Sequence, residues 1–543
     1  MPIRGLGPQS RTDTLLVNAN VLTMDTGRPR AEAIAVTGER IVAVGGQDEL
    51  RNLAAPTTKI VDCQGMTLLP GFIDAHCHLL ALARTFQDLD CRPGLARSIP
   101  ELQWLLRSRA RTLPAGRWVR GYGYDDRQLA EQRHPTRWDL DEAVPDHPVR
   151  LDHRSGHAAV LNSLGLQLAE IHQETPDPVA GIIERVPGTG EPTGVLLEMS
   201  EFLRERLGNV RKWPDLEAGV AGASRQLLSY GVTSIQDAGA DNGLEKWTTF
   251  RRLQESDALA PRVTMFAGAE RLGEFLEAGM RWGSGDHRLR LGHVKVMLTL
   301  TTGDLTPAFE DLGRLTRLAH QAGFPVAVHC IEQEAVKAAA EVLGERRAAS
   351  RNSGDVTPRD RIEHCAECPP ELVDMVRRSG AMVVTQPGFI YWNGPSYRER
   401  VARDLQPHLY PVGALHRAGV SVAFGSDAPV IDPNPWPSIY SAVSWLAHDG
   451  HPVAANSIGQ AVNMETALRA HTLAGAVAEG TASDKGSITP GKLADLVLVD
   501  RDPLATGQDC VEGIRDTRPV MTILGGKIAW QQEGSNVMNH PKV

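Results

Sequence analysis

Short apolar runs alternate with longer amphipathic stretches through the middle of the chain. Eight runs of five to eight residues are rich in β-branched side chains and are bounded by glycine, proline or charged residues, which is typical of buried strands. Stretches with helical periodicity separate most of the later runs. Eight strands that alternate with helices predict an α/β protein with a (β/α)8 TIM barrel. The expected strands are 71–78, 231–237, 262–267, 293–298, 325–329, 360–364, 381–386 and 420–427, and the expected helices are 312–322, 332–343, 370–379 and 411–418.

The first of these strands ends in a His-x-His pair. Successive side chains of a strand point to opposite faces, so His76 and His78 share one face while Cys77 points to the other. Two adjacent imidazoles can reach one divalent cation, and zinc favours nitrogen ligands. Taken alone, the pair is equally typical of two ordinary polar residues that leave a strand. Several later strands also end in residues that can bind a metal, and the chemistry of such barrels lies at the carboxyl ends of the strands.

The two ends of the chain differ from its middle. Short strands with turns are expected over about 13–69 and again after about residue 494. Neither set is large enough to make a stable core alone, so we expect both to pair in one composite β-sandwich domain. The expected domain ranges are 1–70 and 481–543 for the sandwich and 71–480 for the barrel.

A long insertion separates the first two barrel strands. It covers 79–230, far more than an ordinary βα connection needs, so it is expected to have structure of its own. Because it follows the carboxyl end of the first strand, we expect a lid or a substrate-binding subdomain there.

Composition narrows the class of protein. With 543 residues, 42% hydrophobic and 23% charged, the chain is typical of a soluble globular enzyme with more than one domain. A net charge of -9 gives no support for a nucleic-acid partner. Seven scattered cysteines argue against a disulfide scaffold and favour a reducing compartment. Neither a signal peptide nor an apolar run long enough for a membrane is evident, so a cytoplasmic protein without a membrane partner is expected.

The metal-competent residues resemble, in type and order, those of the metal-dependent amidohydrolase superfamily. That family carries His-x-His on strand 1, Lys on strand 4, His on strands 5 and 6, and Asp on strand 8. The most similar branch is amidohydrolase family 3, which includes N-substituted formamide deformylases. The resemblance extends to the C-terminal stretches 486–488 and 490–497 and implies the same composite β-sandwich. The matching residues are His76, His78, Lys295, His329, His364 and Asp427.

The resemblance implies a site for one or two zinc-like ions. His76, His78 and Asp427 would hold one cation, and the other two histidines a second. Lys295 would bridge them after carbamylation by CO2, because an ammonium group cannot bind a metal. Asp427 would also be the catalytic residue, accepting a proton from the attacking hydroxide and delivering it to the leaving nitrogen. The alternatives are a structural lysine paired with an acid, and an aspartate that only caps a turn after the strand.

Two further residues are candidates for substrate binding. His157 lies in Ser155–Asn162, a stretch that resembles a motif of this branch, and could hydrogen-bond a substrate carbonyl or oxyanion. Gln386, at the end of the seventh strand, could orient the substrate. A surface histidine bonded to water and a polar strand cap are the alternatives. The stretch Met297–Asp304 lacks the Asp-Gly-Ser type of loop usual in this branch, so the substrate can differ from those of better-known relatives.

These features predict a metal-dependent hydrolase that cleaves a carboxamide or formamide C–N bond of a small molecule by metal-activated hydroxide. The same chemistry could cleave a carbamate, an ester or a lactone, since all present an electrophilic carbonyl. A purely structural metal is a third hypothesis, but such a site would be closed by four protein ligands. The sequence leaves the oligomeric state open, a homo-oligomer included.

Overall fold

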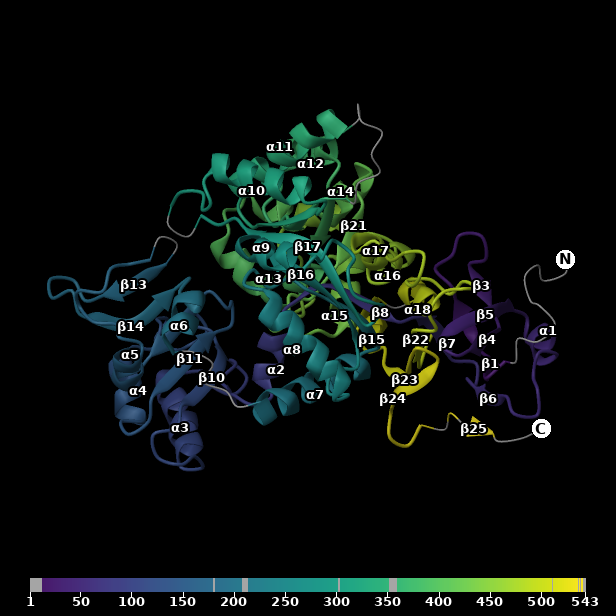
Figure 1. Cartoon of the computed structure of the whole chain (residues 1–543), viewed down its shortest axis with the longest axis horizontal. Coiled ribbons are helices and arrows are strands. Elements are labelled where there is room, and N and C mark those ends of the chain that lie inside the picture. The colour runs from purple at the N-terminus through teal and green to yellow at the C-terminus, as the bar shows by residue number, and fades with distance from the viewer. Residues whose placement is uncertain are drawn as a thin grey trace.

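The computed structural model describes residues 12–178, 181–207, 213–300, 303–350, 359–509, 511–535, 537 and 539–540. The chain forms three parts (Figure 1). A central barrel separates a β-sandwich, which contains both described ends of the chain, from the inserted subdomain at the opposite end of the molecule. The predicted domain ranges also include 1–11 and 541–543, which lie outside the described residues.

The barrel is an eight-stranded parallel sheet, so the predicted fold class is confirmed. Its neighbours follow the order of the chain, and backbone hydrogen bonds near the carboxyl ends join the last strand segment to the first: Asp427 donates to His76 at 2.7 Å and His78 donates to Ala428 at 2.8 Å. In chain order the strands are β8 (Phe72–Cys77), β15 (Val232–Asp237), β16 (Arg262–Gly268), β17 (Leu289–Met297), β18 (Val326–Cys330), β19 (Arg361–His364), β20 (Met382–Thr385) and β21 (Val422–Phe424).

The largest difference from the predicted strands is at β17, which begins four residues before the expected 293. The segment Leu289–Gly292 was not expected to be a strand because Arg290 interrupts its apolar character. Arg290 is accommodated because its guanidinium stacks on the Trp282 ring, 5.0 Å from the ring centre.

Helices surround the barrel, and each predicted helix is present. Together with the smaller helices of the connecting loops they are α2 (Leu79–Thr85), α7 (Trp213–Ser229), α8 (Leu244–Glu255), α9 (Leu272–Glu277), α10 (Phe309–Gln321), α11 (Gln333–Ser350), α12 (Pro370–Ser379), α13 (Pro387–Arg400), α14 (Val412–Arg417), α15 (Pro435–Ser444), α16 (Met464–Ala470), α17 (Leu473–Ala478) and α18 (Pro503–Asp509). Short 3-10 helices lie at Ala269–Arg271, Gln406–His408, Ala455–Gln460 and Val511–Ile514.

The β-sandwich combines strands from both ends of the chain, as predicted. One sheet has the order β25-β6-β1-β4-β5 and the other β24-β23-β22-β7-β2-β3. Apolar side chains from both sheets, such as Ile34 and Leu498, share one core. A buried ion pair between Arg262 of the barrel and Asp495 of the sandwich, 2.7 Å apart, joins the two domains. The strands are β1 (Thr14–Val17), β2 (Asn20–Leu22), β3 (Arg30–Ala31), β4 (Ala33–Thr37), β5 (Arg40–Gly45), β6 (Lys59–Asp62), β7 (Thr67–Pro70), β22 (Leu496–Val499), β23 (Pro519–Leu524), β24 (Lys527–Gln531) and β25 (Asn539–His540), with helix α1 at Gln47–Arg51.

The insertion contains a six-stranded sheet of its own, with the order β13-β14-β12-β11-β10-β9. Two cores flank this sheet: α3 and α4 pack on one, α5 and α6 on the other. Helices α2 and α7, at the start and the end of the predicted insertion 79–230, pack against each other beside the barrel. The elements are β9 (Leu89–Asp90), α3 (Ile99–Ala110), β10 (Val119–Tyr124), α4 (Arg137–Ala143), β11 (Val149–His153), β12 (Ala158–Leu161), α5 (Ser163–Leu168), β13 (Ile182–Arg185), β14 (Pro192–Leu197) and α6 (Ser200–Leu207).

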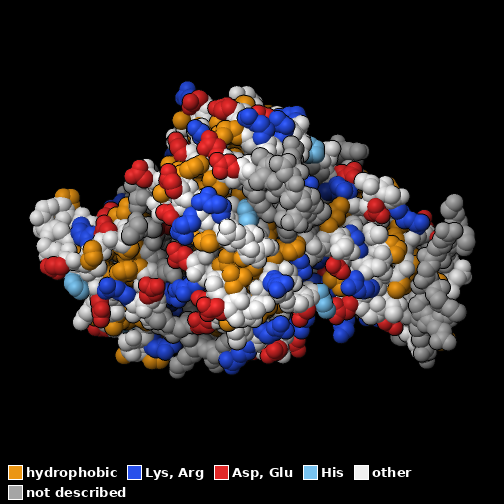
Figure 2. Space-filling model, turned by 45° about the horizontal axis from the view of Figure 1, so that its top comes forward, with side chains coloured by type: hydrophobic (Ala, Val, Ile, Leu, Met, Phe, Trp, Pro, Cys, Tyr) orange, Lys and Arg blue, Asp and Glu red, His pale blue; other side chains and the backbone are white. Residues whose placement is uncertain are grey.

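The surface carries charges of both signs. In Figure 2, basic and acidic side chains are interspersed over the visible face, without a continuous basic stripe. Among the described residues, no helix combines the length and the apolar character needed to cross a membrane.

Candidate metal centre

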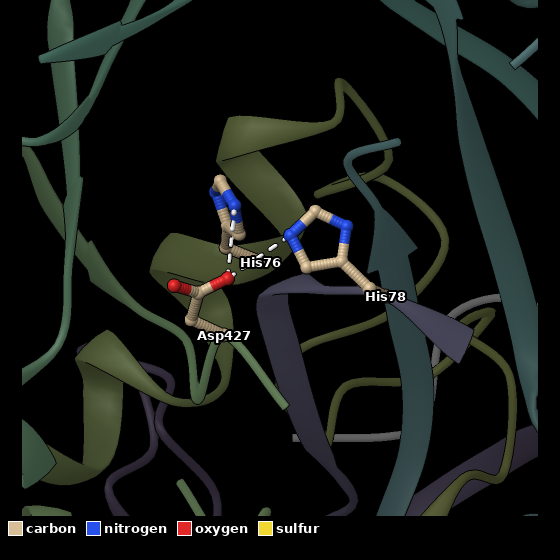
Figure 3. Close-up of side chains that lie close together, drawn as sticks. All are labelled: His76, His78 and Asp427. Atoms are coloured by element: carbon tan, nitrogen blue, oxygen red, sulfur yellow. Dashed lines mark ion pairs between the residues drawn. The ribbon is translucent and has the colours of Figure 1, made fainter. Parts of the chain in front are cut away.

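Three side chains with metal-binding atoms converge at the carboxyl end of the barrel (Figure 3). His76 lies on β8, His78 precedes α2, and Asp427 follows β21. Nε2 of His78 is 3.0 Å and Nε2 of His76 is 3.5 Å from the same atom, Oδ1 of Asp427. Donor atoms of a tetrahedral zinc site lie about 3.4 Å apart, because each is about 2.1 Å from the ion. The two separations therefore suit donors that share one cation.

The loop that carries Asp427 is fixed against β8. Gly425 lies so close to this strand that a Cβ atom there would be 2.6 Å from the backbone nitrogen of His76. Buried Asp74 accepts hydrogen bonds from the hydroxyl of Ser426 at 2.5 Å and from its backbone N–H at 2.9 Å. Asp427 then adopts a left-handed backbone, with φ 57°, which ends the extended segment. These contacts position the carboxylate rather than leaving it on a mobile turn.

The electrostatic surroundings keep Asp427 ionised. Burial alone would raise the pKa of this carboxyl group, but the hydrogen bond from His78 and the nearby imidazoles of His76 and His364 hold the pKa well below its usual range. A carboxylate that is ionised at neutral pH can ligate a cation or accept a proton.

His329 and His364 continue a row of imidazoles beyond His76. The ring centres are 5.4 Å apart for His78 and His76, 4.8 Å for His76 and His364, and 4.5 Å for His364 and His329. His364 has a left-handed backbone, with φ 65°, so the alternation of side chains between the two faces of β19 ends at this residue. Burial lowers the pKa of His76, His329 and His364, which favours the neutral imidazole, the form that binds metals.

Gln386 contacts one of these histidines directly. Its Oε1 accepts a hydrogen bond from Nδ1 of His364 at 2.8 Å, which leaves Nε2 of that ring available as a donor atom. Gln386 is fully buried, and its amide nitrogen has no partner among the described residues. Gln386 therefore supports His364 directly, and its contact with substrate stays a prediction.

Lys295 lies on β17 and is buried within the same group of residues. Burial lowers its pKa, against the opposing charges of Glu363 and Asp427. On the sheet Lys295 pairs with Ala327 of β18, two residues before His329, and it interacts electrostatically with both His76 and His329. The structure therefore brings all six predicted ligands to one end of the barrel. Within this group, the described residues whose donor atoms lie mutually within 4.8 Å are His76, His78 and Asp427.

A buried carboxylate that the sequence analysis did not identify supports this centre. Oε2 of Glu363 is 2.5 Å from Nδ1 of His76, and both Glu363 oxygens accept hydrogen bonds from Arg361, at 2.7 and 2.9 Å. Arg361 also donates to the carbonyl of Ala75 and to Gln236. The sequence feature that could have identified Glu363 is Arg361-Ile362-Glu363. Side chains two residues apart on a strand share one face, so both charged groups lie on the same face of this barrel strand.

The insertion reaches the centre through His157. Its ring centre is 6.1 Å from that of His329, although the two residues lie in different parts of the fold. Nδ1 of His157 is 2.9 Å from Oε1 of Glu198, and this hydrogen bond raises the pKa of His157. Glu198 follows strand β14 and was not identified from the sequence. The two residues meet because β12, which His157 directly precedes, pairs with β14 about forty residues later.

The donor set fits a divalent cation. Nε2 of His76 is buried and has no hydrogen-bond partner among the described residues, although a carboxylate lies 3.5 Å away. Neutral imidazoles and a carboxylate are ligands that zinc and similar ions prefer. His76, His78 and Asp427 could hold one ion, with Lys295, His329 and His364 beside them.

A comparison with known families decides the class of protein. The model of the amidohydrolase family matches residues 59–529, from the sandwich through the whole barrel and back to the sandwich. The chain is a member of the amidohydrolase family. The resemblance inferred from the sequence is therefore confirmed, and this amidohydrolase is a metal-dependent hydrolase that acts on C–N bonds.

One relative is similar in sequence over nearly its whole length, and two solved structures are similar in fold. The N-substituted formamide deformylase of Arthrobacter pascens is 29% identical over 554 residues, covering 96% of this chain and 99% of the relative. An uncharacterized metal-dependent hydrolase from Pyrococcus horikoshii OT3 has a similar structure, with a TM-score of 0.73 at 24% identity over 92% of this chain and 99% of the other. An adenosine deaminase from Xanthomonas campestris, solved with bound zinc, has a TM-score of 0.54 at 18% identity over 97% and 95% of the two chains.

Proposed function

We propose that this amidohydrolase cleaves the C–N bond of a small carboxamide or formamide, using zinc held by His76, His78 and Asp427. The observation that carries the proposal is the convergence of two imidazoles on one carboxylate oxygen at 3.0 and 3.5 Å. The formamide deformylase named above supports this substrate class, and the zinc-bound deaminase of similar fold supports the choice of metal.

The metal supplies Lewis acidity, which polarises a carbonyl group and lowers the pKa of a water molecule. Asp427 holds the proton that this water loses. Both histidines contact Oδ1 of Asp427, so Oδ2 is the oxygen available for proton transfer. The water oxygen bonds to the carbonyl carbon, the C–N bond breaks, and Asp427 returns the proton to the leaving nitrogen. The products are a carboxylic or formic acid and an amine.

The insertion supplies a group for the developing negative charge. His157, with its pKa raised by the hydrogen bond to Glu198, donates a hydrogen bond to the carbonyl oxygen as that atom becomes an oxyanion. In this proposal the insertion acts as a lid that brings His157 next to the barrel. Gln386 orients His364 and offers its amide nitrogen to the substrate.

A second cation would be held by His329 and His364, with Lys295 as the bridge. Burial of Lys295 favours its neutral amine, the form that reacts with CO2 to give a carbamate. The support for this part is the position of Lys295 beside His76 and His329, and it is separable from the proposal for the first ion.

The experiment is a comparison of matched substrates. Purified enzyme with zinc is assayed on N-formyl and N-acetyl derivatives of one amine, and on the ester and carbamate of the corresponding alcohol, with product amine or alcohol quantified. We expect kcat/KM for the formamide or carboxamide to exceed that of the ester. Turnover of the ester or carbamate alone would assign the alternative chemistry. The matched control is Asp427→Asn, which separates barrel chemistry from contaminating hydrolases.

A further inference from the structure

A second group of metal-binding side chains lies in the insertion, away from the barrel centre. Strands β10 and β11 are parallel neighbours, and their carboxyl ends pair Tyr124 with His153. Asp125 and Asp126 directly follow β10, and His134 lies in the loop before α4. Four side chains with nitrogen or carboxylate donors therefore meet at one edge of the inserted sheet.

The distances within this group resemble those of the barrel centre. Nε2 of His153 is 3.2 Å from Oδ1 of Asp126, and Nε2 of His134 is 4.0 Å from Oδ2 of the same carboxylate. Donor atoms of Asp125, Asp126 and His153 lie mutually within 4.8 Å. The corresponding separations in the barrel are 3.0 and 3.5 Å. Small side-chain adjustments would bring these donors to the about 3.4 Å spacing of a tetrahedral site.

The outer contacts of both histidines suit ligands. Nδ1 of His134 is 2.9 Å from the hydroxyl of Tyr124, and Nδ1 of His153 is 2.8 Å from the hydroxyl of Ser155. Both rings thus place Nδ1 against a hydroxyl oxygen and turn Nε2 toward Asp126. Nδ1 of His153 also lies 3.1 Å from the backbone nitrogen of Ser155, so metal binding through Nε2 requires the tautomer in which Nδ1 carries the proton and donates to the Ser155 hydroxyl. Histidines that bind metals are commonly held in this way through their other nitrogen. Nε2 of His153 is buried and makes no hydrogen bond of good geometry with a described residue.

The carboxylate of Asp125 is held by hydrogen bonds. Oδ2 of Asp125 accepts hydrogen bonds from Arg154 and Gln128, each at 3.0 Å, and Oδ1 accepts the backbone N–H of Arg127 at 3.1 Å. An ordinary ion pair between His153 and Asp126 is the competing explanation. The geometry does not favour that pair, because Nε2 of His153 is buried and makes no hydrogen bond of ordinary geometry with a described residue although a carboxylate oxygen lies 3.2 Å away.

We propose that Asp125, Asp126, His134 and His153 bind one divalent transition-metal ion of the zinc class, separate from the barrel centre. Four protein ligands close such a site, which gives it a structural rather than a catalytic role. Arg154, next to His153, donates to Asn393 of barrel helix α13 at 2.5 Å. An ion at this position would therefore fix the strand ends from which Arg154 and His157 reach the barrel.

The test measures zinc stoichiometry. Wild-type enzyme, Asp126→Asn and His153→Gln are each saturated with zinc chloride, passed through gel filtration and analysed for bound metal. We expect each variant to carry one zinc per chain fewer than wild type. The matched control is His172→Gln, an exposed histidine of the same insertion, which should keep the wild-type content. Equal zinc content in wild type and folded variants would overturn the proposal.

A second experiment uses the wild-type enzyme, so that the proposal can be tested even if the variants fail to fold. Crystals of wild-type enzyme are soaked in zinc chloride, and anomalous diffraction is recorded on both sides of the zinc absorption edge. The expected result is a peak among the four side chains in addition to any peak at the barrel centre. A peak in the barrel without one in the insertion would overturn the second site and leave the proposed function intact.

Discussion

Glu363 lies 2.5 Å from Nδ1 of His76, with both side chains fully buried. A carboxylate that already accepts two hydrogen bonds from Arg361 can only accept another, so Nδ1 must carry the proton. Nε2 of His76 is then unprotonated and faces Asp427. One contact therefore fixes both the orientation and the tautomer that metal binding requires.

We expect Glu363→Gln to weaken zinc binding by about 10–100-fold, the usual effect of losing such a support. The amide keeps the size of the side chain but offers one oxygen instead of two to His76 and Arg361. Zinc affinity is measured by competition with a chelator, and the melting temperature is recorded beside it. Unchanged affinity in a folded variant would contradict the role of Glu363.

Asp427→Asn separates catalysis from metal binding. The amide keeps one ligating oxygen but cannot take a proton, and general acid–base catalysis is typically worth about 10²–10⁴-fold in rate. We expect kcat to fall by at least that factor while most of the zinc stays bound. Metal content and kcat are determined on the same preparation. Retained metal with near wild-type kcat would remove Asp427 from proton transfer.

Lys295→Ala tests the carbamate bridge. We expect the variant to lose metal and activity, since the second ion would lose its bridging ligand. A short carboxylic acid added to the variant should restore part of both, because it can replace the missing carboxylate. The complementary check uses active wild-type enzyme, in which the intact mass and the electron density at Lys295 are examined. An unmodified Lys295 would mean that the site holds one metal, or two metals bridged by water alone.

Glu198→Gln tests the contribution of the insertion. Glu198 raises the pKa of His157, so its removal should lower that pKa. If protonated His157 stabilises the oxyanion, kcat decreases as pH rises through its pKa. The alkaline limb of the plot of kcat against pH should therefore move to lower pH in the variant. A profile that keeps its shape would indicate that His157 and Glu198 form only a structural pair. His157→Gln, which removes the titrating group, should abolish that limb.

Buried His471 predicts a loss of stability in acid. Its two ring nitrogens have no hydrogen-bond partner among the described residues, and burial lowers its pKa to about 3. Between pH 6.5 and about 3 the unfolded chain therefore binds a proton that the folded chain excludes, so stability falls as pH falls through this range. The slope is about 1.4 kcal/mol per pH unit for one such group.

His471→Phe should reduce this dependence. The ring packs edge-on against Phe72 and Phe424, which an apolar ring can also do. Urea unfolding at pH 7 and pH 5 gives the free energy of unfolding for both proteins. We expect the difference between the two pH values to be smaller in the variant. If the difference in the free energy of unfolding is the same in both proteins, other groups, such as buried His293, cause the loss of stability in acid.

The sequence by itself determined the barrel, the composite sandwich and the family. Strand and helix periodicity are local properties, and they were sufficient because the barrel strands are short and almost entirely buried, even where polar residues such as Arg361 and Glu363 interrupt the apolar run. The types and order of the candidate ligands, from His76 to Asp427, were equally readable, since each lies on or directly after a strand whose carboxyl end meets the others. Their roles as ligands stay predictions.

Only the tertiary structure decided which groups support these residues. Glu363 is 287 positions from His76, and Glu198 reaches His157 only because two strands of the insertion pair. The left-handed backbone at His364 also breaks the alternation from which its direction would be read. Contacts of this kind depend on strand pairing and on single backbone angles, which depend on the packing of the whole chain rather than on the composition of any one segment.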